Sequence, residues 1–297
     1  MNSSTNEETL TVGLIGFGEA GQAIAKSLRK EKSINICAFD KNFCSEISIK
    51  KQYTKTKIKL FNNPKKLAEK ANIIISVVTA EQSANAAKKI SKHLNKNHIY
   101  LDGNSVSPGT KIKTNTIIKF SGATYYDLAI MAPIHPLGHK TKMLVAGSNN
   151  TKIKKILKKL KFNYEWESSE IGKAAVVKML RSIMIKGVES LLTECITASE
   201  KIGIHDRILL SAEKTLGIKN IKKLADYFME RSALHGLRRS DEMNEVVKTL
   251  KEMKRSSHMS KAISIHQKMI GKLTLKKKFK NKIPQDRIKI ARAIRKV

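Results

Sequence analysis

Residues 11–28, TVGLIGFGEAGQAIAKSL, decide the fold of this chain. The stretch begins as an apolar strand, turns at Gly16, Gly18 and Gly21, and continues with the spacing of a helix. The first glycine permits a tight turn, the second lets a ligand approach the backbone, and the third lets the helix pack closely on the strand. The helix N-terminus adds free N–H groups and the positive end of a dipole. The stretch therefore predicts a turn that binds a diphosphate.

A carboxylate farther along the chain favours a dinucleotide as the ligand. A second predicted strand, residues 34–39, ends at Asp40, about 20 residues after the glycines, where a carboxylate would accept hydrogen bonds from ribose hydroxyls. A carboxylate there repels a 2′-phosphate, so we expect NAD, with NADP as the alternative because Lys41 follows directly. The other interpretation is a glycine-rich turn without a ligand. The cofactor-binding residues expected here are Gly16, Phe17, Gly18, Glu19, Ala20, Gly21, Asp40 and Lys41.

Strand-like and helix-like patterns alternate over roughly the first 165 residues, which predicts right-handed βαβ units and a parallel sheet. The predicted strands are residues 10–15, 34–39, 73–78, 98–101, 124–130, 143–146 and 164–166. The predicted helices between them are residues 22–30, 64–70, 82–94 and 150–161.

The pattern changes at Glu170, where residues 170–203 form one helical pattern without proline, and the remainder is also helical. The expected fold class is α/β, with an N-terminal Rossmann-type dinucleotide-binding domain, a long bridging helix and an all-α C-terminal domain. The expected divisions are a disordered lead over 1–9, a dinucleotide-binding domain over 10–168, and a helical domain over 169–297 for substrate binding and dimerisation. We expect a homodimer.

The net charge of +33 has two interpretations. Clustered lysine and arginine can neutralise the phosphates of a nucleic acid, whereas AT-rich codons produce a lysine-rich and isoleucine-rich chain without any such role. Basic residues are spread along the whole chain and aromatics make up 5%, so we expect no nucleic-acid partner. The basic stretch 272–297 is typical of a solvated helix or a frayed end.

The remaining composition points to a cytoplasmic protein without metal or membrane contacts. No apolar run reaches about 18 residues, and the polar first ten residues lack the pattern of a signal peptide. The three cysteines have no metal-binding spacing and are odd in number, which fits a reducing compartment.

Four motifs resemble the β-hydroxyacid dehydrogenase superfamily, which includes 6-phosphogluconate dehydrogenase, 3-hydroxyisobutyrate dehydrogenase and the imine reductases. They are VGLIGFGEAGQAIAKSLR (12–29), SVVTAEQSANAA (76–87), YLDGNSVSPGT (100–110) and IGKAAVVKML (171–180). The stretches 178–203 and 235–253 resemble a phosphogluconate-dehydrogenase-like helical domain whose reactions are mostly unassigned. The resemblance covers about residues 10–255.

The resemblance implies roles for individual residues. Val78 and Thr79 would lie in a loop beside the nicotinamide, and Asn104 and Ser105 would contact substrate or nicotinamide. Lys178 would be the catalytic residue. The chain departs from the family pattern at Ser182, where an asparagine is usual, and at residues 131–133, Met-Ala-Pro, where many members have Ser-Gly-Gly.

Lys178 also stands out on the helix itself. Steps of 4, 7 and 11 residues return to nearly the same helix face, so Lys178, Ser182, Ile185 and Glu189 form one stripe. A lysine can remove a hydroxyl proton from a secondary alcohol and return it in the reverse reaction, and Ser182 could orient it. The alternative interpretation is that Lys178 is one of many surface lysines.

Three more residues are candidates for substrate binding. Arg238 and Arg239 could clamp an acidic substrate, although they could equally form a solvated face paired with Asp241 and Glu242. His135 lies near the expected substrate loop.

The sequence therefore predicts an NAD(P)-dependent oxidoreductase that transfers hydride between a nicotinamide cofactor and a small acidic 3-hydroxy acid, or a related carbonyl or imine, with Lys178 as general acid/base. Two alternatives stay open. One is a dinucleotide-binding redox sensor without catalysis, and the other is a basic protein associated with nucleic acid.

Overall fold

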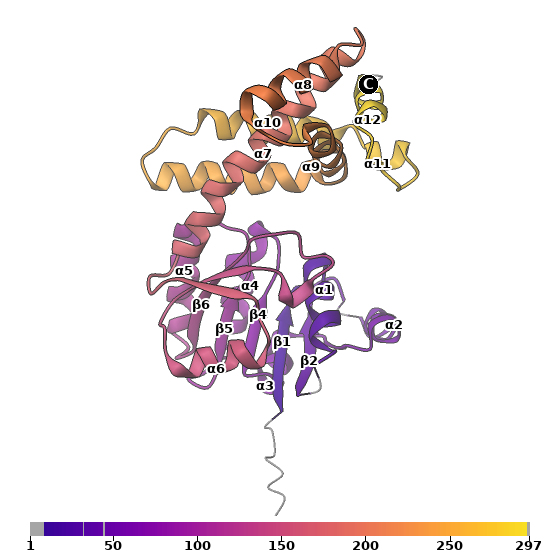
Figure 1. Cartoon of the computed structure of the whole chain (residues 1–297). Coiled ribbons are helices and arrows are strands. Elements are labelled where there is room, and N and C mark those ends of the chain that lie inside the picture. The colour runs from indigo at the N-terminus through magenta and orange to yellow at the C-terminus, as the bar shows by residue number, and fades with distance from the viewer. Residues whose placement is uncertain (1–8, 32, 44, 296–297) are drawn as a thin grey trace, which may run out of the picture. The chain divides into compact units, whose positions relative to one another are not determined.

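The computed structural model describes residues 9–31, 33–43 and 45–295, and it divides into two compact units, Met1–Lys178 and Met179–Val297 (Figure 1). The boundary falls within helix α7, Lys173–Glu200. The disordered lead expected over residues 1–9 lies, except for Thr9, outside the described residues.

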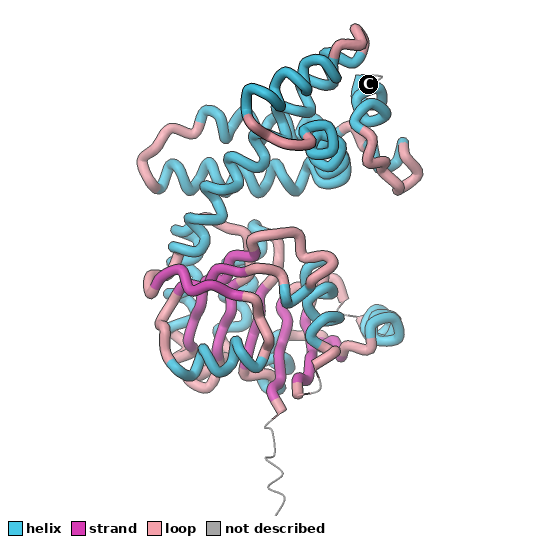
Figure 2. The backbone as a smooth tube through the Cα atoms, viewed as in Figure 1, coloured by secondary structure: helices cyan, strands magenta, loops and turns pink. Residues whose placement is uncertain are grey.

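The first unit is built on one sheet, drawn in magenta in Figure 2. Its eight strands have the order β3-β2-β1-β4-β5-β6-β7-β8. The strands are β1 Leu10–Ile15, β2 Ile34–Phe39, β3 Lys59–Phe61, β4 Ile73–Ser76, β5 Ile99–Asp102, β6 Thr124–Ile130, β7 Met143–Ala146 and β8 Tyr164–Ser168. The expected α/β class is confirmed, but an all-parallel sheet is wrong at one place, because β7 runs antiparallel to β6. The connection over 131–142 contains only the short 3₁₀ helix η2, Gly138–Lys140. It therefore lacks the crossover helix that would bring the chain back to the end of the sheet where β6 begins, as a parallel strand requires.

Side chains of each central strand alternate between two cores on opposite faces of the sheet. Ile73 and Ile75 of β4 lie in one core and Ile74 in the other. Helices α1, Glu19–Leu28, and α6, Thr151–Lys159, cover the first core. The second core is covered by α3 Pro64–Lys70, α4 Ser83–Ser91 and α5 Pro108–Lys119. Strands buried on both faces explain the continuous apolar runs of the sequence.

Three elements of this unit were not predicted from the sequence. Helix α2, Glu46–Thr56, buries little apart from Gln52, and β3 has only three residues, so neither has a strong hydrophobic pattern. Helix α5 follows the capping residue Ser107, whose hydroxyl accepts a hydrogen bond from the N–H of Thr110, and begins at Pro108.

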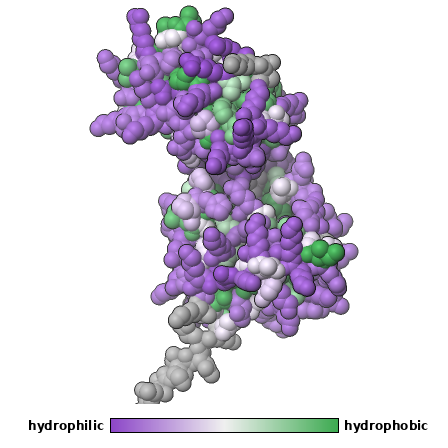
Figure 3. All heavy atoms as spheres, turned by 90° about the vertical axis from the view of Figure 1, so that its right-hand side faces the viewer, coloured by the Kyte–Doolittle hydropathy of each residue, from purple (hydrophilic) through white to green (hydrophobic). Residues whose placement is uncertain are grey.

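The second unit is helical. After α7 come α8 His205–Leu216, α9 Ile221–Glu252, α10 His258–Lys272, α11 Leu275–Lys278 and α12 Arg287–Arg295. No helix of the described residues is long and apolar enough to cross a membrane. Hydrophilic side chains cover most of the face seen in Figure 3, as expected for a chain with 58 lysines and arginines.

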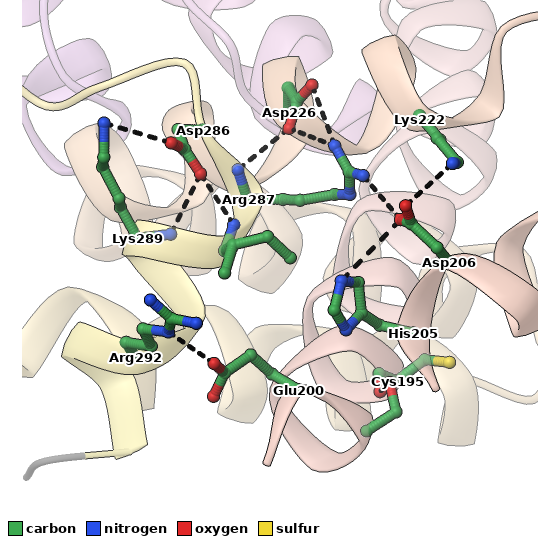
Figure 4. Close-up of polar contacts among 12 residues, drawn as sticks. Cys195, Glu200, His205, Asp206, Lys222, Asp226, Asp286, Arg287, Lys289 and Arg292 are labelled. Carbon is green, nitrogen blue, oxygen red and sulfur yellow. Dashed lines mark hydrogen bonds and ion pairs between the residues drawn. The ribbon is translucent and has the colours of Figure 1, made fainter. Parts of the chain in front are cut away.

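The basic C-terminal stretch is folded over its described part, so the expectation of a frayed end is wrong there, and the expected solvated helix is buried on one side. Ile290 and Ala291 of α12 are fully buried against the core of the second unit. Arg287 bridges Asp206 and Asp226, with nitrogen–oxygen distances of 2.6 and 3.0 Å (Figure 4). One apolar face and the ion-paired arginines together hold this stretch on the second unit. The acidic partners of Arg287 lie on α8 and α9, far away in the sequence.

The pKa of Asp206 reflects this network. Hydrogen bonds from Lys222 and Arg287 lower the pKa of the Asp206 carboxyl to about 2. A carboxyl whose pKa is lower in the folded state stabilises the fold above its ordinary pKa, and this contribution disappears as the pH falls toward 2.

We expect Arg287→Met to lower the unfolding midpoint by about 2–4 °C at pH 7, because a partly exposed ion-pair network contributes on the order of 1 kcal/mol. The difference from wild type should narrow between pH 4 and pH 2.5, where protonation of Asp206 removes the same interaction. Lys289→Met is the control, since Lys289 pairs only locally with Asp286. Unfolding midpoints are measured by thermal denaturation. An equal decrease in Arg287→Met and Lys289→Met would contradict the stabilising role of Arg287.

Candidate active site

The three glycines of the turn after β1 have separate structural reasons. Gly16 has φ +93°, and a Cβ there would lie 2.6 Å from the carbonyl oxygen of Val77. A Cβ on Gly21 would collide with the carbonyl oxygen of Gly16. At Gly18 a Cβ would meet no atom within 4 Å, and this residue precedes α1 without any side-chain cap. The turn therefore leaves open space at Gly18, beside the N-terminus of α1, where a diphosphate would bind.

Asp40, at the end of β2, braces this turn. Its Oδ2 accepts a hydrogen bond of 2.7 Å from the N–H of Phe17, and its Oδ1 accepts one of 2.9 Å from the N–H of Asn42. The Phe17 ring is fully buried in the core. Glu19 and Lys41 are exposed beside the turn, and Ala20 is partly exposed. The end of β2 thus brings a carboxylate directly against the glycine turn, and the contact of Asp40 with a ribose stays a prediction.

Asn104 links the ends of two further strands. Its Oδ1 accepts a 2.7 Å hydrogen bond from the N–H of Val78, and its Nδ2 donates to the hydroxyls of Ser76 and Ser83. The side chain is buried, so it holds the loop after β4 in place. The contact of Asn104 with substrate or nicotinamide that the resemblance implies stays a prediction, and in this structure its side-chain amide braces the loop. Thr79 and Ser105, on either side of it, are exposed and partly exposed.

Lys178 follows a firmly anchored turn of α7. Ala174 and Ala175 are buried, and the N–H of Ala175 donates a 3.0 Å hydrogen bond to Oδ2 of Asp127 in β6. Just before the helix, Gly172 packs so closely on Pro108 that a Cβ would lie 3.3 Å from the proline ring. Pro108 begins the helix that follows the loop containing Ser105. The backbone leading to Lys178, itself partly exposed, is therefore fixed on the same unit as the glycine turn.

The loop between β6 and β7 carries His135. The residue is exposed and its bond to Pro136 is cis. Met131, at the start of this loop, packs with Ala174 at the start of α7.

The remaining predicted residues belong to the second unit, where Arg239 is largely buried and Arg238 is about half exposed. Arg239 lies 2.5 Å from Oε2 of Glu189, and Arg238 lies 3.7 Å from Glu242. Oε1 of Glu189 accepts a 2.6 Å hydrogen bond from the hydroxyl of Ser232. Burial raises the pKa of Glu189, and Arg239 opposes that change. Ser182, one turn after Lys178 on α7, is buried.

Sequence reasoning missed a second buried charge cluster, in the first unit. Lys111 lies 3.1 Å from both Asp102 and Asp127, and all three side chains are essentially inaccessible. The available signal was Asp127 within the apolar strand TYYDLAI, because a carboxylate in a buried strand requires a partner. Lys111 itself is one of 58 basic residues and carries no such signal.

The strand order reverses direction between β1 and β4, and the glycine turn, Asp40 and Asn104 all follow carboxyl ends of strands beside this point. A crevice at such a position is where doubly wound sheets bind dinucleotides. The described residues contain no cluster of metal-ligating side chains. The first unit is therefore a dinucleotide-binding domain of the Rossmann type.

Comparison with known proteins defines the family. Residues 11–163 match the NAD binding domain of 6-phosphogluconate dehydrogenase, and residues 199–268 match a domain of unknown function, DUF1932. An uncharacterized 28.5 kDa protein of Methanothermus fervidus is 33% identical over 80% of this chain and 90% of its own length.

Solved structures of other proteins share the fold of this chain. A conserved hypothetical protein from Sinorhizobium meliloti is 29% identical, with 96% of this chain and 97% of that chain covered and a TM-score of 0.73. The 3-hydroxyisobutyrate dehydrogenase of Mycobacterium tuberculosis, solved with L-serine, is 10% identical with a TM-score of 0.71, covering 97% of this chain and 99% of that one. The chain belongs to the β-hydroxyacid dehydrogenase superfamily.

Two glycine variants distinguish the glycine that leaves room for the ligand from the glycine that lets the helix pack on the strand. We expect Gly18→Ala to keep the wild-type unfolding midpoint but to weaken NADH binding by about tenfold or more, because the new methyl group fills the space left for the diphosphate. Gly21→Ala should instead destabilise the protein by roughly 1–3 kcal/mol through overpacking. Thermal denaturation and NADH fluorescence titration measure the two effects. Unchanged NADH affinity in Gly18→Ala would argue against this turn as the binding site.

Proposed function

We propose that this protein is an NAD-dependent oxidoreductase that transfers hydride between the nicotinamide and a small acidic 3-hydroxy acid, with Lys178 as general acid/base. Residues 10–168 bind the cofactor, and residues 169–297 serve substrate binding and dimerisation. The family match supports the coarser part of this proposal, a dehydrogenase or reductase that uses a nicotinamide cofactor.

The preference for NAD rests on Asp40. Its carboxylate lies at the end of β2, hydrogen-bonded to the N–H of Phe17 in the glycine turn, which is where a ribose would bind. A negative charge at this position repels a 2′-phosphate. Lys41 is exposed beside Asp40 and supplies the opposite charge. The ratio of the affinity for NAD to the affinity for NADP therefore measures which of the two charges decides cofactor preference.

The observation that carries the proposed activity is the anchoring of the turn before Lys178. Asp127 holds the N–H of Ala175, and Pro108 packs on Gly172, so the backbone of the lysine has little freedom. In the oxidation direction the Lys178 amine accepts the hydroxyl proton of the substrate, and in reduction it returns that proton to the forming alkoxide. A bound nicotinamide ring supplies the hydride acceptor. Ser182, one helical turn further, orients the lysine.

Three observations support an acidic 3-hydroxy acid as the substrate. The M. tuberculosis enzyme of the same fold is named for a 3-hydroxy acid and was solved with another, L-serine. Ser105 is partly exposed on the loop that Asn104 braces, and His135 is exposed on the neighbouring connection. The net charge of +33 attracts anions. Arg238 and Arg239 remain candidates for clamping the substrate carboxylate, although Glu242 lies 3.7 Å from Arg238 and Glu189 pairs with Arg239.

We expect Lys178→Met to lower kcat by roughly 10²–10⁴-fold while NADH affinity stays within about threefold of wild type. Lys173→Met is the matched control, since Lys173 lies on the same helix but pairs locally with Glu170. The measurement follows reduced-cofactor absorbance with L-serine, 3-hydroxypropanoate and 3-hydroxybutyrate, each with NAD and with NADP.

The outcomes of this screen separate the function classes. If Lys178→Met kept more than about a tenth of the wild-type rate, the acid/base role would be wrong. If the wild-type protein bound NADH but turned over none of the hydroxy acids, carbonyls or imines tested, the redox-sensor alternative would replace the enzyme.

We also propose a homodimer that forms through the second unit, in the cytoplasm. On α7 and α10 the side chains of Leu191, Ile265 and Met269 are at least half exposed. A hollow of about 620 Å³ lies beside them, lined mainly by apolar residues of α7, α10 and α12. An exposed apolar surface of this kind on a charged protein is typical of a protein–protein interface, and a second copy offers the same surface in return.

We expect the wild-type protein to have the mass of a dimer by light scattering and Ile265→Glu to shift it to a monomer, because a charge would be buried at the interface without a partner. Leu216→Glu is the control, since it adds the same charge at an exposed leucine near the end of α8. A monomeric wild-type protein at micromolar concentration would exclude this interface.

A further inference from the structure

Of the buried cluster of Asp102, Lys111 and Asp127, only Asp127 enters the function proposed so far, through its hydrogen bond from the N–H of Ala175. The Lys111 amine lies 3.1 Å from Oδ1 of each carboxylate and also donates to the main-chain carbonyl of Asp102. The exposed fractions of the three side chains are 0, 1 and 0%. Burial by itself would lower the pKa of Lys111, but the two carboxylates outweigh it and raise the pKa above its ordinary value. One ammonium group therefore stays charged between two carboxylates.

Asp102 uses its other contacts to hold the loop after β5. Its Oδ1 accepts a 3.0 Å hydrogen bond from the N–H of Asn104, and its Oδ2 accepts one of 2.7 Å from the hydroxyl of Tyr125. Asn104 in turn holds the loop after β4 through Val78. The carboxylate thus fixes the segment that contains Ser105.

Asp127 holds a different segment. Its Oδ2 accepts the N–H of Ala175 in the first turn of α7, three residues before Lys178. A carboxylate at a helix N-terminus satisfies a free N–H group and complements the helix dipole. The two segments also touch directly, since Gly172 packs on Pro108. Lys111 is consequently a buried cation that links the Ser105 loop to the Lys178 turn through these two carboxylates.

Stability alone does not require this arrangement. Replacing a buried ion cluster by apolar residues of similar volume is often neutral or stabilising, because burying charges is costly. Directional hydrogen bonds are what an apolar core would lack. Here Asp102 accepts one from the N–H of Asn104 and Asp127 accepts one from the N–H of Ala175, and both residues belong to segments used by the proposed function.

We infer that Lys111 is a positioning residue, which sets the spacing between the loop carrying Ser105 and the turn of α7 carrying Lys178 through Asp102 and Asp127. This inference rests on the proposed function, since it assigns the two segments to substrate and proton transfer. A misplacement of about 1 Å between reacting groups can reduce a rate by about 10²-fold.

Turnover of the full-length protein provides the first test. We expect Lys111→Met to lower kcat by about 10²-fold, with NADH affinity within about threefold of wild type. Thr114→Val is the matched control, because Thr114 is a fully buried residue of the same helix, one turn farther, outside the cluster. Asp127→Asn keeps the Lys111–Asp102 pair and guards against misfolding of the first variant. A kcat within about threefold of wild type in Lys111→Met would overturn the inference.

Hydrogen exchange followed by mass spectrometry tests the same coupling without turnover. Lys111→Met should speed exchange in peptides covering both 102–107 and 172–178, Asp102→Asn mainly in the first, and Asp127→Asn mainly in the second. Thr114→Val should change neither. Faster exchange spread equally over the strands of the sheet would mean general destabilisation and would overturn the inference. If the wild-type protein proved inactive on every substrate, the proposed function would fail, and this exchange pattern would still decide whether Lys111 couples the two segments.

Discussion

The contact between Gly21 and the carbonyl oxygen of Gly16 is the constraint on which the first unit depends. No side chain fits between them, so α1 can lie directly against the end of β1. That close approach points the uncapped N-terminus of α1 into open space at Gly18. It also brings the Phe17 N–H within 2.7 Å of Asp40. One backbone contact thus aligns the helix, the diphosphate position and the neighbouring carboxylate.

Both units contain buried charges, and each cluster links segments that are distant in sequence. In the first unit Lys111 joins β5, β6 and α5, and Asp127 extends the link to α7. In the second, the Glu189–Arg239 pair joins α7 to α9, and Gln267 adds α10. In a chain of net charge +33, interior carboxylates are few, and the structure pairs each of these with a cation.

Much of the fold could be predicted because the decisive signals are local. The glycine spacing, the apolar strands β1 and β2, and helix α3 follow from residues close together in sequence. The direction of β7 could not be predicted in this way, since it depends on how the 131–142 connection packs. The folded C-terminal stretch depends in the same way on Asp206 and Asp226, about 60 to 80 residues away.

By itself the sequence determined the glycine turn and the position of Asp40 at the end of β2, because glycine spacing and strand patterns are properties of short segments. Only the tertiary structure decided that Asn104 serves as a brace, that Arg239 is neutralised by Glu189, and that Lys111 joins two carboxylates. The physical reason is that a charge or amide inside a protein takes its role from the partner that folding brings to it. Spacing along the chain contains no record of that partner.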